Sequence, residues 1–336
     1  QAIQSALSKL FVELTEQLGE TTDNILEISL VANPIMHHLV LGINPINLGG
    51  APFALTLDEA VTLKASDLGL DAHLQARLFV LPCIAGHVGA DTAGVILAEA
   101  PDREKAMSLI VDVGTNAEIV LGNEDRLLVC SSPTGPAFEG GEISAGQRAT
   151  AGAIERVRID RETFEPRFKV IGSDFWSTEP GFESSAKGLS ITGICGSGII
   201  EVIAEMFLAG IITKDGIVDG ALAEHTERVR SNGRTWSYVL HFSQHESQRD
   251  IVVTQNDVRQ IQLAKAALYA GIKLLMDKMG VATVDRIRLA GAFGSHISVE
   301  HAMVLGLIPD CALSNVSSAG NAAGVGARIA LLNRES

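Results

Sequence analysis

Aromatic residues are scarce in this chain of 336 residues, where Phe, Trp and Tyr together make up 4%. Leu, Ile, Val and Ala must therefore fill the core. Hydrophobic residues reach 46% and charged residues 20%, which is ordinary for a soluble globular protein. No apolar run is long enough to span a membrane, and no signal peptide opens the chain. We therefore expect a cytoplasmic protein.

Cysteine is also sparse, and its spacing excludes several kinds of site. The four cysteines lie far apart, at Cys83, Cys130, Cys195 and Cys311. Because no C-x-x-C pair exists, neither a zinc site nor an iron–sulfur cluster is indicated, and free thiols in a reducing compartment are expected. His37, His38 and His87 have no carboxylate at ligand spacing, so we expect satisfied structural histidines instead of a metal site.

Positive charge is in the minority, with 26 Lys and Arg against 40 Asp and Glu and a net charge of −14. This balance argues against nucleic acid or an anionic membrane as the main partner. The acidic residues are spread along the chain, which favours a role in solubility. A basic patch on a partner protein remains compatible with them.

The order of predicted elements indicates an α/β protein. Helical spacing predicts helices over 2–18 and 90–100, and apolar runs predict strands at 25–33 and 76–86. After a charged connection at 100–107 the pattern restarts. It predicts strands at 109–122, 126–132, 155–172, 237–242 and 285–290. It predicts helices after residue 193 and over 254–280, 298–306 and 318–333. Thr254 is the expected N-cap of the longest helix. The boundary therefore divides the chain into domains 1–105 and 106–336.

The stretch "DVGTNAE" places an acid, a glycine, a hydroxyl and an amide at the tip of an apolar hairpin. A turn alone needs only glycine and one small polar residue. Backbone amides at Gly114, helped by Thr115 and Asn116, suit phosphate oxygens. Asp112, at the strand end, suits a magnesium-bound water. A plain β-turn is the alternative.

Two further glycine turns precede helices. In "GICGSGII", Gly193, Gly196, Ser197 and Gly198 open an apolar helix, whose N-terminus offers free amides to an anion. In "LAGAFGSHI", the small residues let the backbone approach a flat ring or a ribose. Gly291, Ala292 and Phe293 are the candidates at this turn, with a place in the core as the alternative for Phe293. Neither turn has the G-x-G-x-x-G or P-loop spacing. For both, a turn that needs small residues for packing is the alternative.

Three isolated acids are candidates for chemistry or partner binding. Asp91, in "GHVGADT", is placed to orient an attacking water as a weak general base, or to act as a helix N-cap. Glu139 and Glu142, in "GPAFEGGEIS", are expected to line an interdomain cleft or contact a partner. Surface solvation is the alternative for this pair.

The order of these motifs resembles that of the phosphate and adenosine motifs in the actin, sugar-kinase and heat-shock-ATPase superfamily. Six blocks narrow the resemblance to the C-terminal ATPase portion of reductive activators of corrinoid proteins, over nearly the whole chain. They are "NPIMHHLVLGINPINLGGAPF", "LPCIAGHVGADT", "DVGTNAEIVLGN", "GPAFEGGEISAG", "ITGICGSGII" and "TQNDVRQIQLAKAA".

The resemblance implies two ribonuclease-H-like, actin-like domains around an interdomain cleft. It implies ATP and Mg²⁺ as ligands, with Asp112, Gly114–Asn116, the glycine turn at 193–198 and Gly291–Phe293 around the nucleotide. In the family, ATP hydrolysis helps to restore Co(II) corrinoid protein to Co(I) for methyl transfer, with an electron from an N-terminal 2Fe-2S domain. A corrinoid protein is thus the expected partner, and a homodimer is possible.

Two departures from the family shape the expectation for this chain. It has no cysteine cluster for the 2Fe-2S centre, and no DxGTTT hairpin precedes Gln1. We therefore expect a fragment whose first domain is truncated and whose nucleotide affinity is weak or lost. Ala117, where relatives carry Gly, should be tolerated if its φ is negative.

Three other functions remain open. The first is a non-catalytic docking module for a corrinoid protein. The second is a small-molecule kinase of the same superfamily, and the third, the weakest, is a Rossmann dehydrogenase. For the last, no G-x-G-x-x-G follows a strand.

Overall fold

The computed structural model describes residues 2–243 and 249–333, which form two compact units. Unit 1 is assembled from residues 1–112, 118–131 and 319–336, and unit 2 from 113–117 and 132–318. The chain leaves unit 1, returns to it and ends in it, and the predicted boundary between residues 105 and 106 stays a prediction.

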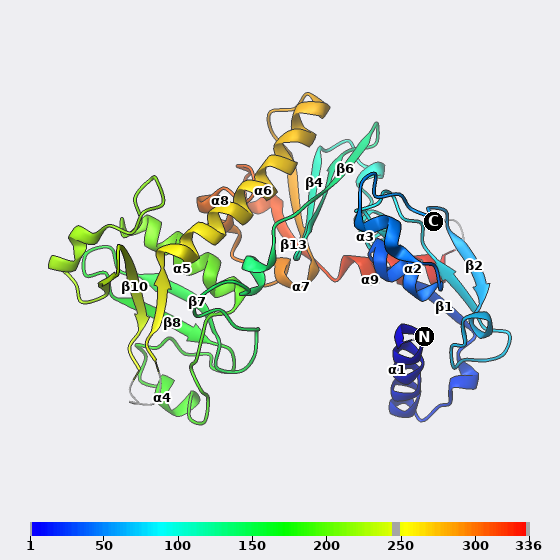
Figure 1. The fold of residues 1–336 in the computed structure, drawn as a ribbon, viewed down its shortest axis with the longest axis horizontal. Helices are drawn as coiled ribbons and strands as arrows, with labels where there is room; N and C mark the ends of the chain where they lie inside the picture. The colour runs from blue at the N-terminus through cyan, green and yellow to red at the C-terminus, as the bar shows by residue number, and fades with distance from the viewer. Residues whose placement is uncertain (1, 244–248, 334–336) are drawn as a thin grey trace. The chain divides into compact units, whose positions relative to one another are not determined.

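The described part of unit 1 contains helices and two groups of strands (Figure 1). The helices are α1 (Ala2–Leu18), α2 (Pro34–Val40), α3 (Ala90–Glu99) and α9 (Ala322–Leu332), and the strands are β1 (Glu27–Leu30), β2 (Val61–Lys64), β3 (Arg77–Val80), β4 (Ser108–Val113), β5 (Ala117–Gly122) and β6 (Leu127–Ser132). In the first group, β3 lies between β1, which is parallel to it, and β2, which is antiparallel. In the second, β4, β5 and β6 are neighbours in chain order. An α/β layer in this half was predicted, although β2 was missed.

The core of unit 1 is aliphatic, as the shortage of aromatic residues requires. Leu78 and Val80 of β3 are fully buried, and Leu7 and Phe11 of α1 pack against the same cluster. The predicted helix over residues 2–18 is confirmed, and its spacing places these two side chains on one face.

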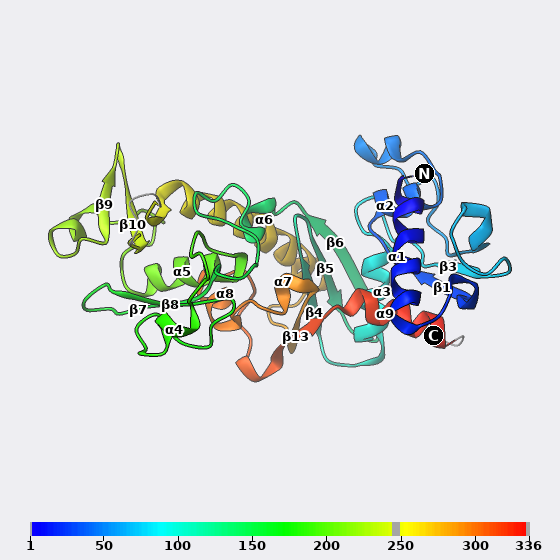
Figure 2. The ribbon, with the colours of Figure 1, turned by 90° about the horizontal axis from the view of Figure 1, so that it is seen from below.

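Helices α3 and α9 cross with their backbones in contact at two glycines (Figures 1 and 2). A Cβ added to Gly326 would overlap the carbonyl oxygen of Gly94, and one added to Gly94 would lie 2.9 Å from Ala323 O.

We therefore expect Gly326→Ala to lower the free energy of unfolding by about 2 kcal/mol, because the helices must move apart. Urea denaturation measures this. Val325→Ala, at the exposed neighbouring position, should stay within about 0.5 kcal/mol of the wild type; equal effects would contradict the close crossing.

Unit 2 is built from hairpins and helices (Figure 2). The strands are β7 (Ile154–Ile159), β8 (Pro166–Val170), β9 (Val229–Asn232), β10 (Thr235–His241), β11 (Ile251–Thr254), β12 (Arg286–Ala290) and β13 (Val316–Gly320), whose last residues belong to unit 1; the helices are α4 (Phe182–Ser185), α5 (Gly196–Leu208), α6 (Gln255–Met279), α7 (Gly291–Gly294) and α8 (Val299–Leu305). β7 and β8 form an antiparallel hairpin. β10 lies between β9 and β11, antiparallel to both, and β12 neighbours β13.

Helix α6 confirms the clearest local prediction. Thr254 is its N-cap and forms a capping box with Asp257, in which each side chain accepts the other residue's backbone N–H. The predicted helix over 318–333 was wrong at its start, because Val316–Gly320 form strand β13. The helix begins only at Ala322, where the side chain of Asn321 accepts the N–H of Gly324.

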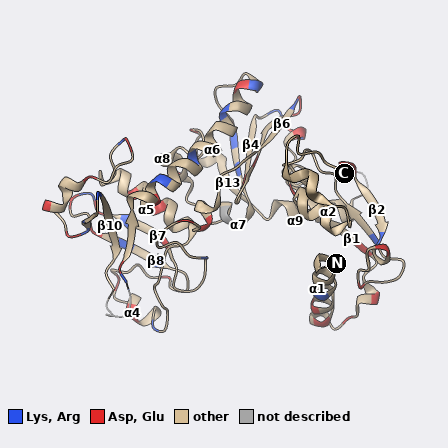
Figure 3. Cartoon of the chain, in the orientation of Figure 1, with Lys and Arg blue, Asp and Glu red and all other residues tan. Residues whose placement is uncertain are grey.

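Charged residues are scattered over both units, as the sequence predicted (Figure 3). Among the described residues, no helix is long and apolar enough to cross a membrane. The four cysteines, all within the described part of the chain, form no disulfide. His38 confirms the expectation of a satisfied structural histidine: its Nδ1 lies 2.9 Å from Pro34 O, and its Nε2 accepts the N–H of Thr56. For His37 the expectation was wrong, because this side chain is fully buried and neither of its ring nitrogens has a hydrogen-bond partner among the described residues.

Candidate functional site

Three carboxyl groups of unit 1 share one partly buried environment. Asp91 lies in the first turn of α3, Asp112 near the end of β4 and Glu118 near the start of β5. Burial, and secondarily the charge of Asp91, raises the pKa of Asp112 to about 6. Burial raises the pKa of Glu118 to about 7. The hydrogen bond from Ser131 lowers this pKa, and the charges of Asp91 and Asp112 raise it further. The structure thus places two predicted site residues together and adds Glu118, which the sequence interpretation missed.

Asp91 is not the N-cap of its helix. That position belongs to Gly89, where a Cβ would lie 2.6 Å from Ala32 O. The Asp91 carboxylate instead accepts the N–H of Thr92 at 2.9 Å. Burial still raises the pKa of Asp91 despite this bond. The N-cap interpretation was therefore wrong, and the role of Asp91 as a base stays a prediction.

No group of three or more His, Cys, Asp or Glu side chains in the described part of the chain has the geometry to hold a metal ion directly. Mg²⁺ usually keeps several of its waters and binds proteins through only one or two carboxylates. The three acids therefore do not form an all-protein metal cage in the described part of the chain, and the magnesium-bound water at Asp112 stays a prediction.

The raised pKa of Glu118 makes the stability of the metal-free chain depend on pH. A carboxyl group whose pKa is raised on folding binds its proton more tightly in the folded state, so stability falls as pH rises from its unfolded pKa to its folded pKa. We expect the free energy of unfolding to fall by about 2 kcal/mol between about pH 4.5 and pH 7. Chemical denaturation at a series of pH values measures this slope. Glu118→Gln should make the slope shallower without abolishing it, because Asp112 also has a raised pKa, about 6, and titrates in the same window. Glu124→Gln, at an exposed turn, should leave the slope unchanged; the wild-type slope in Glu118→Gln would contradict the assignment.

The hairpin tip at 114–116 belongs to unit 2 and is tied to the loop that follows β6. Thr115 Oγ1 donates to Glu139 Oε1 at 2.9 Å. Thr134 Oγ1 donates to the carbonyls of Gly114 and Thr115, at 2.9 and 3.1 Å, and Gly135 N–H donates to Thr115 O. The structure therefore joins two predicted residues, Thr115 and Glu139. Ala117 lies in β5 with a negative φ, so its tolerance is confirmed.

A cavity of about 890 Å³ in unit 2 contains the first turn of α5. Glu139, Gly196 and Ser197 were predicted site residues and line it. The sequence interpretation missed Gln147, Arg148, Glu155, Cys195 and His296, which also line it. The first amides of a helix have no carbonyl partner within it, so this turn offers donors to an anion.

The remaining glycines of this turn have a packing role. A Cβ on Gly193 would lie 2.6 Å from Ala145 O, and one on Gly198 would overlap Ile154 O. Neither residue lines the cavity. The packing alternative weighed for this turn therefore accounts for Gly193 and Gly198, and the ligand interpretation fits Gly196 and Ser197.

The Gly-Ala turn forms the short helix α7. Gly291 has a φ of 81° and Gly294 packs against Leu289, so both positions require glycine. The side chains of Ala292 and Phe293 lie outside what the structure describes, so their predicted adenosine contacts stay predictions. Glu142 is exposed with a φ of 61° and, unlike Glu139, does not line the cavity.

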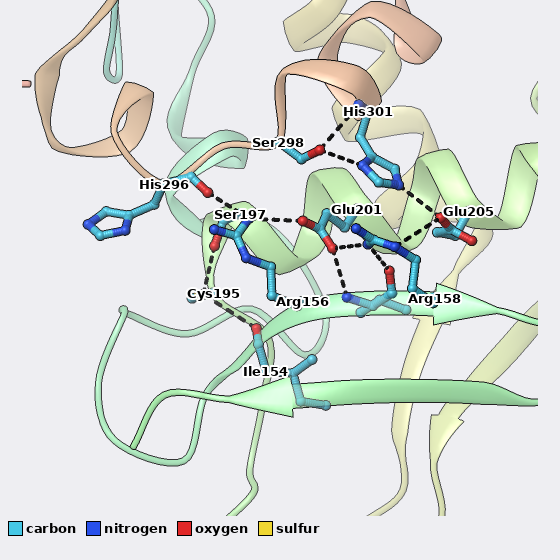
Figure 4. Close-up of polar contacts among 11 residues, drawn as sticks. Ile154, Arg156, Arg158, Cys195, Ser197, Glu201, Glu205, His296, Ser298 and His301 are labelled. Atoms are coloured by element: carbon cyan, nitrogen blue, oxygen red, sulfur yellow. Dashed lines mark hydrogen bonds and ion pairs between the residues drawn. The ribbon is translucent and has the colours of Figure 1, made fainter. Parts of the chain in front are cut away.

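An ion-pair network ties α5 to β7 beside this cavity (Figure 4). Glu201, fully buried on α5, accepts the N–H of Val157 at 2.9 Å, and its two oxygens pair with Arg156 at 2.9 Å and Arg158 at 2.6 Å. One turn later, Glu205 accepts the N–H of Ile159 at 3.0 Å. Residues four apart on a helix lie about as far from each other along the helix as residues two apart on a strand lie along the strand. The two carboxylates can therefore both reach an amide of β7, and the helix completes the edge of this strand.

Glu205 extends the network to α8. Its Oε1 lies 2.9 Å from His301 Nε2, and His301 Nδ1 lies 2.6 Å from Ser298 Oγ at the N-cap of α8. Burial pushes the pKa of Glu205 upward, but the bonds from His301 and from the Ile159 amide hold it below its ordinary value. Helix α5 is thereby fixed to β7 and α8 at the same time.

The fold and these sites define the class of protein. Residues 106–336 match the family described as the C-terminal domain of RACo, the ASKHA domain, which is an actin-like ATPase fold. Residues 1–104 match the family described as the RACo middle region. The chain therefore belongs to the RACo family, and the predicted actin-like α/β fold and family resemblance are confirmed.

Individual relatives agree with the family. The chain is 36% identical over 343 residues to the corrinoid activation enzyme RamQ of Eubacterium limosum, covering 100% of this chain and 55% of the relative. It is 28% identical over 262 residues to the Co(II) methylated amine-specific corrinoid protein reductase of Methanosarcina barkeri, covering 75% and 44%. A solved reductive activator for corrinoid, iron–sulfur protein superposes with a TM-score of 0.81 and 31% identity, over 99% of this chain and 51% of that one. This chain spans about half the length of the curated relatives it matches.

Proposed function

We propose that this chain is the nucleotide-binding ATPase portion of a reductive activator that returns Co(II) corrinoid protein to Co(I). The carrying observation is the group of buried carboxyls around Asp112 in a chain whose residues 106–336 match an ASKHA domain. The names of the relatives supply the corrinoid protein as the expected partner. The electron would come from a 2Fe-2S domain outside these 336 residues.

Each unit supplies different chemistry in this proposal. In unit 1, Asp112 would hold a water of a bound Mg²⁺, and Asp91 or Glu118 would be the weak base beside it. In unit 2, Gly114, Thr115 and Asn116, with the α5 amides at Gly196 and Ser197, bind phosphate oxygens. Bound Mg²⁺ would neutralise charge on the phosphates. Phosphoryl transfer depends mainly on such positioning and electrostatic stabilisation, so no strong nucleophile is needed.

The loop at 135–146 is the proposed contact with the corrinoid protein. Glu142 is exposed there and does not line the cavity, so it lies outside the proposed nucleotide site. Glu139 lines the cavity and accepts a hydrogen bond from Thr115, so it belongs to both the loop and the proposed nucleotide site. A cytoplasmic location and a homodimer belong to the same proposal. A docking module without ATPase activity is the second candidate, favoured by the exposed Glu142 on this loop.

Calorimetric titration of MgADP and MgATP tests the proposal, with the 336-residue chain beside a form extended at its N-terminus. Binding to either form, lost in Asp112→Ala, supports nucleotide binding through the carboxyl group. Phosphate release that rises on adding Co(II) corrinoid protein supports the activator function. Binding of the corrinoid protein without any nucleotide binding would establish the docking module in its place.

A further inference from the structure

The unit 2 cavity has an imidazole on its lining that none of the predicted nucleotide contacts uses. His296 is exposed, and within the described residues its ring has no hydrogen-bond partner. Phe138 also lines the cavity but is only 1% exposed, so it belongs to the packed wall. His296 is thus the accessible flat ring of the cavity. It lies two residues beyond the α7 turn, the segment expected near the nucleoside.

The main chain at His296 is held by an ion pair whose carboxylate is buried and whose guanidinium is partly exposed. Arg156 NH1 donates to His296 O at 2.9 Å and to Glu201 Oε1 at 2.9 Å (Figure 4). Glu201 is fully buried on α5, so one guanidinium links the loop to a fixed point on that helix. Arg158 pairs with the same carboxylate but makes no hydrogen bond to His296 in the described structure.

The same helix also supplies another part of the lining. Cys195 is the N-cap of α5, and Gly196 and Ser197 begin its first turn. On the far side of the loop, the bond between His301 and Glu205 anchors α8 to α5. Helix α5 therefore fixes the distance between its own first turn and the main chain at His296.

We propose, resting on the proposed function, that His296 is a nucleotide-contacting residue and that Arg156 is a positioning residue acting through its carbonyl. The imidazole packs its flat face on the nucleobase while the α5 amides take the phosphate end. A flat aromatic ring suits a base because stacking needs only a face on each partner. Arg156 makes no contact with the ligand. Its hydrogen bond to His296 O holds the loop in the position from which the imidazole can stack on the base.

Calorimetry with MgADP as the probe tests the two roles. His296→Ala should weaken binding about tenfold, and His296→Phe, which keeps a flat ring, should stay within about threefold of the wild type. Arg156→Ala should weaken binding about fivefold. The matched control is Arg158→Ala, which removes the other guanidinium from Glu201 and should change binding less than twofold. A histidine-ring NMR signal, assigned by its loss in His296→Ala, should shift when MgADP is added.

The outcomes separate this inference from the proposed function. Wild-type affinity in His296→Ala, with a ring signal that does not move, overturns the inference and leaves nucleotide binding intact. Equal weakening by Arg156→Ala and Arg158→Ala shows a general loosening and overturns the positioning role. If neither the chain nor its extended form binds MgADP, the proposed function fails and this inference fails with it.

Discussion

Asp112→Asn should lower ATP hydrolysis by about 100- to 1000-fold, the usual loss when one group that stabilises a transition state is removed. The amide keeps the shape of the carboxyl group but holds a magnesium-bound water poorly. The same change should raise stability by about 1–2 kcal/mol near pH 8, because the ionised Asp112 is buried beside Asp91 and its pKa is raised to about 6. Phosphate release and urea denaturation measure the two effects.

The opposite signs of these effects make the prediction specific. A variant that loses activity because it is poorly folded would lose stability as well. Asp125→Asn makes the same chemical change at an exposed position in the β5–β6 turn and should alter neither quantity. Full hydrolysis by Asp112→Asn would show that this carboxyl does not position the metal. A loss of stability in Asp112→Asn would show that the Asp112 carboxylate has a stabilising partner in the folded protein, which its raised pKa does not reflect.

Local signals in the sequence were sufficient for most of the fold. Helices α1, α3, α5 and α6 follow from apolar spacing and capping residues, and the hairpins β4–β5 and β7–β8 from apolar runs around turns. The short strands β2, β9 and β11 were missed, and each is defined by its partner across the sheet. Strand β13 was missed because its Ser, Ala and Gly residues also suit a helix start.

The candidate site was predictable only where a motif is continuous in the chain. Asp112, Thr115 and Ser197 stand in glycine turns and were found. Glu118 had a signal that was not used: it is a charged residue inside the otherwise apolar strand "AEIVLG". Its pKa is raised mainly by burial and to a smaller extent by the charge of Asp91, which is 27 positions away, so no local pattern predicts it.

The cavity residues Arg148, Glu155 and His296 come from three separate segments of unit 2. Nothing in the spacing of these residues indicates that they meet. Their proximity results from how β7, α5 and α8 pack, and that packing depends on Glu201 and Glu205. In the sequence these two glutamates read as the polar positions of an apolar helix, although Glu201 is fully buried.

Glu201→Ala should therefore be among the most destabilising single changes in this chain, with a loss of about 3–5 kcal/mol in the free energy of unfolding. Removing the carboxylate leaves two guanidinium groups beside each other and the Val157 N–H without an acceptor. Urea denaturation measures the loss. Glu162→Ala, an exposed glutamate in the turn between β7 and β8, is the matched control and should stay within about 0.5 kcal/mol of the wild type.

A triple variant shows how the charge and the amide contribute to this loss. Replacing Glu201, Arg156 and Arg158 together by apolar residues removes all three charges, and such replacements of buried ion pairs are often neutral or stabilising. Here the Val157 N–H still loses its acceptor, so we expect a remaining loss of about 1–3 kcal/mol. If the triple variant is as unstable as Glu201→Ala, the whole loss comes from the Val157 N–H at the strand edge. If its free energy of unfolding returns to the wild-type value, the whole loss comes from the unpaired guanidinium charges. An intermediate value means that Glu201 both neutralises the arginines and completes the edge of β7.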